Sequence, residues 1–210
     1  MLTNRHNVTG LNNITGEPLH PNGYTPNEVN IIHNRQGYLG QWVSKLEPLL
    51  EDWEPLWIEH PTLGSSADFV ALPLTQTEGI ELYPYNLENQ PEILVRPSDP
   101  INVIGFPFGL TGGGALAIWS TGFMATEPDI DYENQPKFLI DCRARQGQSG
   151  SAVVSHYNSG LVPMMNGDSV AYVNPVTRFM GIYSGRINAQ SDLGIVWKAS
   201  AIKELVDSIK

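Results

Sequence analysis

The sequence predicts an all-β fold that ends in one short helix. Its 210 residues include 20 glycines and 16 prolines, which is high for a helical protein and fits short strands joined by many turns. Short apolar runs rich in β-branched residues also recur along the second half of the chain, as in a β-sandwich or β-barrel. The strands expected there cover residues 101–106, 116–123, 138–141, 151–155 and 179–183.

The first half of the chain has the same rhythm in a weaker form. Residues 10–30, rich in Asn, Gly, Pro and Thr, predict a loop, and strands are expected at 30–34, 37–46 and 56–59. An apolar run follows at 67–74. Four prolines between residues 84 and 100 then indicate a linker. We therefore expect an N-terminal domain over residues 1–85 and a C-terminal domain over residues 86–210.

The final helix is expected over residues 200–210. Ser200 is a good N-cap, and Ile202, Leu205, Val206 and Ile209 follow at the spacing i, i+3, i+4 and i+7. This spacing places the four apolar side chains along one stripe of a short amphipathic helix.

The charge balance bears on the binding partners. The chain has 12 basic and 22 acidic residues, a net charge of −10, and no cluster of Lys or Arg that could follow a phosphate backbone. We therefore expect it to bind neither nucleic acid nor a membrane. No signal-peptide pattern and no apolar run of membrane-spanning length is visible, and Cys142 is the one cysteine, so a cytoplasmic location is expected.

No metal or cofactor is expected. A metal-ligand spacing such as HExxH is missing among His20, His33, His60 and His156, and Cys142 is alone. Asp129 and Asp131 beside Pro128 indicate a solvated loop. The three glycines at 112–114 are not followed by Lys-Ser or Lys-Thr, so they predict a hairpin tip and not a phosphate-binding loop.

The sequence GQSGS at residues 147–151 suits a nucleophile. Gly147 lets the backbone turn sharply and direct amide N–H groups into a small space, where they could stabilise an oxyanion beside Ser149. A short apolar strand follows directly. The same five residues also fit an ordinary Gly/Ser turn that leads into a strand.

His6 and Asp68 supply the other groups that acyl transfer needs. A serine hydroxyl requires a base to remove its proton, histidine titrates in the suitable range, and a carboxylate can fix the histidine tautomer. Asp68 stands at the entrance of the apolar run, where it could equally be a strand-entry cap. His6 alone could equally be a surface residue beside a turn.

Taken in order, five segments resemble landmarks of the chymotrypsin-like (trypsin-like) serine peptidases. They are TNRH at 3–6, ADFVAL at 67–72, GFPFG at 105–109, GQSGS at 147–151 and GIYSG at 181–185. The resemblance covers most of the chain. It implies two six-stranded antiparallel β-barrels, an active site between them and a C-terminal helix.

The resemblance also implies a catalytic role for each matching residue. Ser149 would attack the scissile carbonyl, His6 would act as general base and then as general acid, and Asp68 would hold His6. The backbone N–H groups of Gly147 and Ser149 would form the oxyanion hole. The implied activity is a serine endopeptidase that cleaves a peptide or protein substrate through an acyl-enzyme intermediate.

Substrate contacts are implied for two further segments. Tyr183, Ser184 and Gly185 resemble the strand that pairs with the substrate backbone and lines one wall of the specificity pocket. Arg143 would lie near the base of that pocket, which favours acidic or polar side chains at the cleavage site over basic ones.

The chain departs from the family pattern at several positions. Asn4 and Arg5 stand where two small residues are usual, Gln148 replaces an acidic residue, and Ser151 replaces a glycine. The five residues before His6 also span only one short strand, whereas the family has about two strands there. We therefore expect a first barrel that lacks its N-terminal strands. Either an upstream segment or a partner chain would complete this barrel, and we favour the upstream segment.

Two other functions remain open at this stage. A protease-like scaffold can persist as an inactive binding module, because a fold does not prove a function. An esterase-like hydrolase could use the same triad. Labelling by a serine-directed phosphonate separates the first from an active enzyme, and comparing peptide with ester substrates separates the second.

Overall fold

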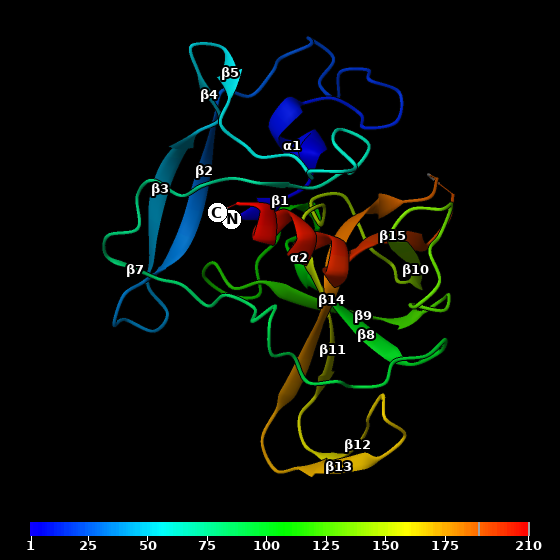
Figure 1. The fold of residues 1–210 in the computed structure, drawn as a ribbon. Helices are drawn as coiled ribbons and strands as arrows, with labels where there is room; N and C mark the ends of the chain where they lie inside the picture. The colour runs from blue at the N-terminus through cyan, green and yellow to red at the C-terminus, as the bar shows by residue number, and fades with distance from the viewer. Residues whose placement is uncertain (189, 210) are drawn as a thin grey trace. The chain divides into compact units, whose positions relative to one another are not determined.

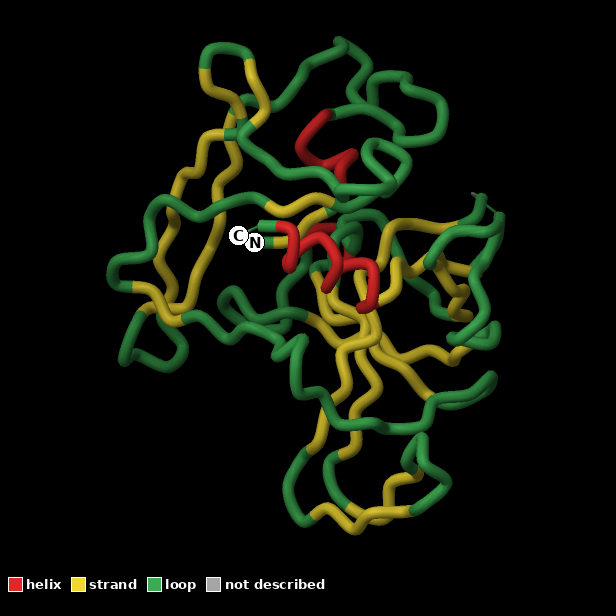
Figure 2. Tube along the Cα trace, viewed as in Figure 1, coloured by secondary structure: helices red, strands yellow, loops and turns green. Residues whose placement is uncertain are grey.

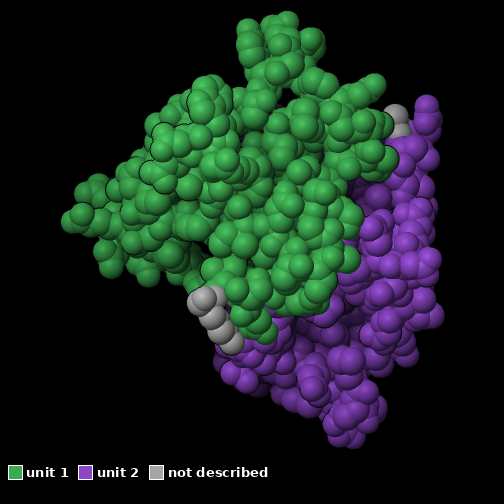
Figure 3. Space-filling view, turned by 45° about the horizontal axis from the view of Figure 1, so that its top comes forward, with its two compact units in different colours: residues 1–84, 111–116, 204–210 green, residues 85–110, 117–203 purple. Residues whose placement is uncertain are grey.

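The computed structural model describes residues 1–188 and 190–209, which form two compact units (Figure 3). Unit 1 comprises residues 1–84, 111–116 and 204–210, and unit 2 comprises residues 85–110 and 117–203. Each unit is described by itself below.

Unit 2 contains a closed antiparallel β-barrel, as predicted for the second half of the chain (Figures 1 and 2). The order around the barrel is β10-β15-β14-β11-β8-β9, and pairing of β10 with β9 closes it. The barrel strands are β8 (Pro100–Gly105), β9 (Ile118–Met124), β10 (Lys137–Asp141), β11 (Ala152–Tyr157), β14 (Val176–Arg186) and β15 (Leu193–Lys198). All five sequence-predicted strands of this half are therefore confirmed, and β15 is an addition.

The barrel interior is apolar. In β8 the side chains of Ile101 and Val103 are buried, whereas Asn102 between them is only partly covered. This alternation follows from the two-residue period of a strand, which sends successive side chains to opposite faces. Branched and aromatic residues from the other strands, such as Phe138 and Val196, complete the core.

A two-stranded hairpin extends from the ends of β11 and β14, at the lower edge of Figure 1. It consists of β12 (Gly160–Pro163) and β13 (Ser169–Tyr172), and the sequence did not predict it. Its turn contains Gly167 at a φ of 88°, a left-handed conformation that glycine adopts without steric cost.

Unit 1 also contains β-strands, joined by long loops, but its described strands do not close into a barrel. A three-stranded sheet has the order β3-β2-β7, and two small sheets pair β1 with β6 and β4 with β5. The bounds are β1 (Leu2–Thr3), β2 (Glu28–Arg35), β3 (Trp42–Pro48), β4 (Leu50–Glu51), β5 (Glu54–Pro55), β6 (Val70–Ala71) and β7 (Ile80–Glu81).

The expectation of two barrels is therefore only half confirmed. β7 pairs only with Asn34 and Arg35 of β2, so residues 28–33 have no strand partner on that side among the described residues. A sheet with such an edge cannot close on itself.

Two of the strands predicted in unit 1 are shorter in the structure than expected. Residues 37–41 form a turn, with Gly37 and Gly40 both at positive φ, so β3 starts only at Trp42. In the stretch 56–59, Ile58 makes no more than an isolated bridge to Ala71, because β6 is only two residues long at that point.

Two helices complete the chain. α1 (Arg5–Thr9) was not predicted and ends at Gly10, which has a φ of 70°. α2 (Ala199–Ser208) confirms the expected C-terminal helix. Of its predicted apolar stripe, Ile202 and Leu205 are buried, whereas Val206 remains exposed.

Candidate active site

His6 and Asp68 form a close pair in unit 1. The Nδ1 atom of His6 lies 2.8 Å from Oδ2 of Asp68, and the backbone N–H of His6 donates to Oδ1 of the same carboxylate at 3.0 Å. Both side chains are largely covered by protein. Since a carboxylate only accepts hydrogen bonds, the contact at Nδ1 places a proton on that nitrogen and leaves Nε2 as the acceptor.

Short backbone elements bring these two residues together. β1 pairs with β6 in the register Leu2 to Ala71 and Thr3 to Val70, and the ladder continues where the Leu72 N–H donates to the Met1 carbonyl. His6 follows β1 in the first turn of α1, and Asp68 precedes β6. The antiparallel register therefore sets the two side chains against each other.

Asn4 strengthens the same junction. It is fully buried, and its Nδ2 donates to the backbone carbonyl of Asp68 at 2.6 Å. A small residue, which the family pattern has here, could not make this bond. Asn4 Oδ1 has no hydrogen-bond partner among the described residues, although it is buried.

Arg5 ties α1 to a second segment of unit 1. Its Nε contacts Oε1 of Glu59 at 2.8 Å, and its Nη1 reaches Oδ1 of Asn13 at 3.4 Å. The guanidinium is therefore occupied at the surface beside His6. The Asn4-Arg5 departure thus has a structural account, because both residues anchor the segment that carries His6.

Ser149 lies in a tight turn of unit 2 between β10 and β11. The turn is held on its far side by the barrel, because the Gly150 N–H donates to the Tyr183 carbonyl and the Tyr183 N–H donates to the Ser151 carbonyl, each at 2.9 Å. The Ser149 hydroxyl approaches the Ser184 carbonyl at 3.4 Å. The nucleophile candidate therefore sits at the rim of the barrel beside β14.

Gln148 fixes the turn from inside. Its side chain is fully buried, its Oε1 accepts the Arg145 N–H at 2.6 Å, and its Nε2 donates to the Ser120 hydroxyl at 3.1 Å. An amide can accept and donate at once, whereas the acidic residue usual here can only accept when ionised. Gln148 is thus built into the turn as a neutral brace.

The peptide between Gln146 and Gly147 has a defined direction. The Gln146 carbonyl accepts the Phe108 N–H at 2.6 Å, and a trans peptide directs its N–H opposite to its carbonyl. The Gly147 N–H therefore points away from Phe108. Gly147 has a φ of 91°, and a Cβ here would lie 2.6 Å from the Phe106 carbonyl oxygen, so this position requires glycine.

The residues predicted to bind substrate have different environments. Tyr183 is buried in the barrel core beside Gly194, and its backbone N–H and carbonyl bond Ser151 and Gly150, next to Ser149. Burial raises the pKa of its phenol strongly. Ser184 and Gly185 lie at the rim, where β14 has a register shift. Ser184 and Gly185 are less covered than Tyr183, and the substrate role of all three residues stays a prediction.

Arg143 lies on the surface. Its side chain is 82 % exposed, and its Nε is 4.0 Å from Oδ2 of Asp192, whose Oδ1 contacts Arg145 Nη1 at 3.3 Å. This position gives no support to a place at the base of a specificity pocket. That role stays a prediction.

The structure thus describes the predicted site in two parts. His6 and Asp68 belong to unit 1, and Ser149, Gly147 and the segment 183–185 belong to unit 2. Sequence reasoning missed Asn4, Gln148 and Phe108 as residues that shape these parts. In the sequence, Asn4 and Gln148 were visible only as departures from the family pattern, and Phe108 only as one residue of the GFPFG segment.

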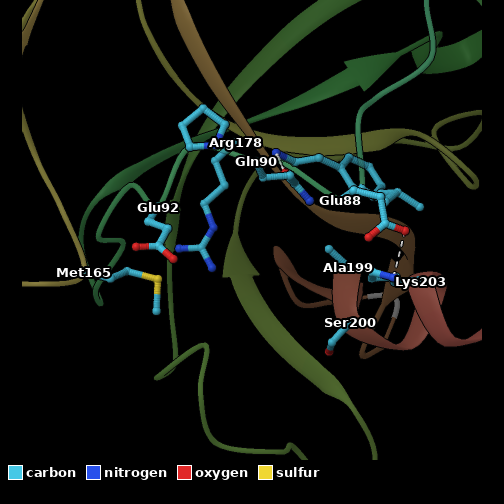
Figure 4. A pocket seen from close by; sticks show the side chains of 11 residues that line it. Glu88, Gln90, Glu92, Met165, Arg178, Ala199, Ser200 and Lys203 are labelled. Carbon is cyan, nitrogen blue, oxygen red and sulfur yellow. Dashed lines mark hydrogen bonds and ion pairs between the residues drawn. The ribbon is translucent and has the colours of Figure 1, made fainter.

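A separate cavity of about 290 Å³ lies in unit 2 (Figure 4). Arg178 extends along its wall, and Lys203 Nζ pairs with Oε1 of Glu88 at 2.9 Å. Glu92 adds a second carboxylate, so the formal charges of the two basic and two acidic side chains cancel. None of the predicted site residues lines this cavity.

Searches of the described residues found neither a membrane helix nor a metal centre. None of the described helices has the length and apolar character needed to cross a membrane. Within the same residues, no three His, Cys, Asp or Glu side chains gather closely enough to hold a metal ion.

Comparison with known proteins gave matches only among solved structures. No protein-family model matches the chain, and no curated protein does. The serine endoprotease from Yersinia pestis matches with a TM-score of 0.48 and 17% sequence identity. The match covers 99% of this chain and 52% of that one, so the chain spans about half the length of the Yersinia protein.

The Rv3671c protease from M. tuberculosis is a further match. Its active form gives a TM-score of 0.39 and 13% identity over 88% of this chain and 81% of that one. An inactive mutant of it gives 0.40 and 15% over 88% and 77%. The solved structures named here are a serine endoprotease and a protease. The roles proposed below rest on the geometry of this chain's own residues.

Proposed function

We propose that this protein is a serine endopeptidase that uses His6, Asp68 and Ser149 and passes through an acyl-enzyme intermediate. The observation that carries the proposal is the double contact between Asp68 and His6. One carboxylate oxygen meets Nδ1 of the ring and the other accepts the backbone N–H of the same residue. A carboxylate held in this way orients the imidazole and stabilises it when it becomes charged.

The tautomer of His6 suits a general base. With its proton on Nδ1, the ring presents the lone pair of Nε2, which can take the proton of a serine hydroxyl. Ser149 Oγ then bonds to the scissile carbonyl carbon. The C–N bond breaks, and Nε2 gives its proton to the leaving amine. Water repeats the sequence on the ester, which releases the acid and restores Ser149.

The turn around Ser149 favours stabilisation of the oxyanion. Phe108 holds the Gln146 carbonyl, so the Gly147 N–H is fixed before any substrate arrives. A donor that needs no reorganisation is worth more to the transition state than a mobile one, and loss of one such donor typically costs about 10²–10³ in rate. Gly147 and the Ser149 amide are our candidates for this role.

The proposed substrate is a peptide or a protein. Ser184 and Gly185 at the rim of the barrel would pair with its backbone, and Arg143 would disfavour basic side chains at the cleavage site. A cytoplasmic location, and completion of the unit 1 sheet by a further segment or a partner chain, stay predictions.

The test is the intact mass of the protein after incubation with a fluorophosphonate. We expect one adduct on the parent chain and none on Ser149→Ala. Ser159→Ala is the matched control, because Ser159 is also followed by glycine and lies exposed in the same unit; this variant should still be labelled. Absence of an adduct on the parent, or an adduct that survives in Ser149→Ala, would refute the proposal.

A peptide library and simple esters then define the reaction. An endopeptidase should cleave internal peptide bonds, and Ser149→Ala should abolish this cleavage. Hydrolysis of esters alone would indicate the esterase-like alternative, and the absence of both labelling and turnover would indicate a binding module.

A further inference from the structure

The turn that precedes β9 exposes an unusual set of apolar side chains. Residues 106–110, which we call the aromatic turn, include the 3₁₀ helix η1 (Pro107–Gly109). The side chains of Phe106, Phe108 and Leu110 are 41%, 65% and 58% exposed. Three large apolar groups side by side in water are costly unless something covers them.

The backbone of the aromatic turn is strained as well as exposed. Phe108 has a φ of 55°, in the left-handed region that bulky L-residues avoid, and Gly109 follows at 72°. Glycine or asparagine at position 108 would satisfy the same geometry at lower cost. Strain combined with an exposed aromatic ring points to a role outside the stability of the fold.

The aromatic turn is attached directly to the nucleophile turn. The Phe108 N–H donates to the Gln146 carbonyl at 2.6 Å, and the turn is closed by bonds from Gly109 to Phe106 and from Leu110 to Pro107, both at 2.9 Å. The α-carbon of Gly147 is so close that a Cβ there would clash with the Phe106 carbonyl. The Phe108 backbone therefore bonds the same peptide group, between Gln146 and Gly147, whose N–H is the candidate oxyanion donor.

The two sides of Ser149 differ. On one side its hydroxyl approaches the Ser184 carbonyl, on the segment proposed to pair with the acyl part of the substrate. The aromatic turn instead contacts Gln146 and Gly147, which precede Ser149 in the chain, whereas Gly150, which follows Ser149, bonds β14 at Tyr183. A peptide bound along Ser184 and Gly185 with its carbonyl at Ser149 would continue past the scissile bond toward the aromatic turn.

We infer that the aromatic turn, through Phe108 and Leu110, forms a subsite for an apolar side chain on the leaving-group side of the scissile bond. This inference rests on the proposed function. It defines a substrate class: peptides with a large apolar residue directly after the cleaved bond, whose side chain would cover the exposed rings and remove apolar surface from water.

Aminolysis of an acyl-enzyme isolates this subsite. The protein is acylated with a p-nitrophenyl ester in the presence of equal concentrations of leucinamide and glycinamide. Either amine attacks the carbonyl carbon of the Ser149 ester; the C–N bond forms, the C–Oγ bond breaks, and the amine proton returns to Oγ by way of His6. The ratio of the two amide products does not depend on how fast the acyl-enzyme forms.

For the parent chain we expect the leucinamide product to exceed the glycinamide product about tenfold. Phe108→Asn, which tolerates a positive φ, should bring the ratio close to one, and Leu110→Asn should lower it without touching the strained position. Phe123→Asn is the matched control. Phe123 is an exposed phenylalanine of β9. It pairs with Pro100 of β8, at the opposite end of the β8–β9 pair from Gly105. It should keep the parent ratio.

The possible outcomes separate the two proposals. Release of p-nitrophenol that depends on Ser149, with a parent ratio near one, would overturn this inference and leave the proposed function intact. A parent preference that survives both Phe108→Asn and Leu110→Asn, or that Phe123→Asn abolishes equally, would also overturn it. Absence of Ser149-dependent release would overturn the proposed function, and this inference with it.

Discussion

Asp68 contacts His6 through both of its carboxylate oxygens, one at the ring and one at the backbone. The backbone contact does not involve the ring at all. It therefore holds the carboxylate in place whichever proton the imidazole carries. The pair lies 62 residues apart in the sequence, so the fold and not a local motif creates it.

Replacement of Asp68 by asparagine should remove catalysis with little change in fold. The new amide can still accept the His6 backbone N–H, but its nitrogen would donate to Nδ1 and move the ring proton to Nε2. His6 could then no longer accept the serine proton. We expect kcat to fall by about 10⁴, the effect of this change in the well-known triad. Circular dichroism should match the parent; a fall of less than tenfold would contradict the assigned tautomer.

Substitution of Gly147 by alanine should be much more harmful than the same change at Gly167. The two glycines have φ values of 91° and 88°, so the conformational cost of a side chain is the same. A Cβ at position 147 would clash with the Phe106 carbonyl, whereas a Cβ at 167 meets nothing within 4 Å. We expect Gly147→Ala to lower fluorophosphonate labelling at least tenfold. Similar labelling rates for the two variants would show that the close packing is not needed.

Removal of the Gln148 side chain should destabilise unit 2. Gln148→Ala empties a buried position and leaves the partly covered Arg145 N–H and Ser120 hydroxyl without these partners, at a cost of about 1 kcal/mol for each lost hydrogen bond. Thermal unfolding followed by circular dichroism measures the loss. Ser159→Ala, which changes an exposed side chain of the same unit, is the control. An unchanged melting temperature for Gln148→Ala would mean that water replaces both bonds.

Acid should weaken unit 1 through Glu47. Burial alone would raise the pKa of this carboxyl, but bonds from the Thr75 hydroxyl and the Thr75 and Gln76 amides outweigh burial and lower it below the ordinary 4.5. The unfolded chain therefore binds the proton more readily. The stabilisation is present above pH 4.5 and is lost as the pH falls through the lower folded value.

The melting temperature measured from about pH 6 to about pH 3 tests this sign. Glu47→Gln should be less stable than the parent at neutral pH, because it loses charge-assisted hydrogen bonds. The difference between the two proteins should shrink as the pH falls below 4.5. A difference that stays constant would show that the charge of Glu47 does not contribute. Burial also lowers the pKa of His33, and the Glu47 charge opposes this shift. Both proteins should therefore lose stability as the pH falls below 6.5, and Glu47→Gln should lose more.

The second half of the fold could be predicted because its strands carry their own signal. Val153 and Val154 or Ile101 and Val103 are β-branched residues in runs bounded by turn formers, and such runs have few alternatives to a buried strand. The first half lacks this redundancy. The strands β1, β6 and β7 are each two residues long, and their pairing depends on partners far away in the sequence.

The site was predicted in part. His6, Asp68 and Ser149 were predicted from their residue types and local settings as well as from a resemblance. The structure describes the contact between the first two, and the catalytic role of all three stays a prediction. α1 could not be predicted, because five residues contain too little periodicity. Tyr183 was assigned to the substrate from its neighbours; its side chain is buried in the barrel core, and its substrate role stays a prediction. The exposure of Phe108 depends on a left-handed backbone conformation, which a bulky residue normally avoids and which its sequence therefore does not predict.

The division into units also affects how the chain can be made. The chain passes from one unit to the other after residues 84, 110, 116 and 203, so unit 1 gathers a segment from the middle of the sequence and another from near its end. During synthesis, which proceeds from the N-terminus, unit 1 cannot acquire all of its segments until residues 204–210 have left the ribosome. Unit 2, which the chain supplies by residue 203, can close its barrel first. His6 and Asp68 thus precede every residue of unit 2 in the chain, yet their own unit is completed after unit 2.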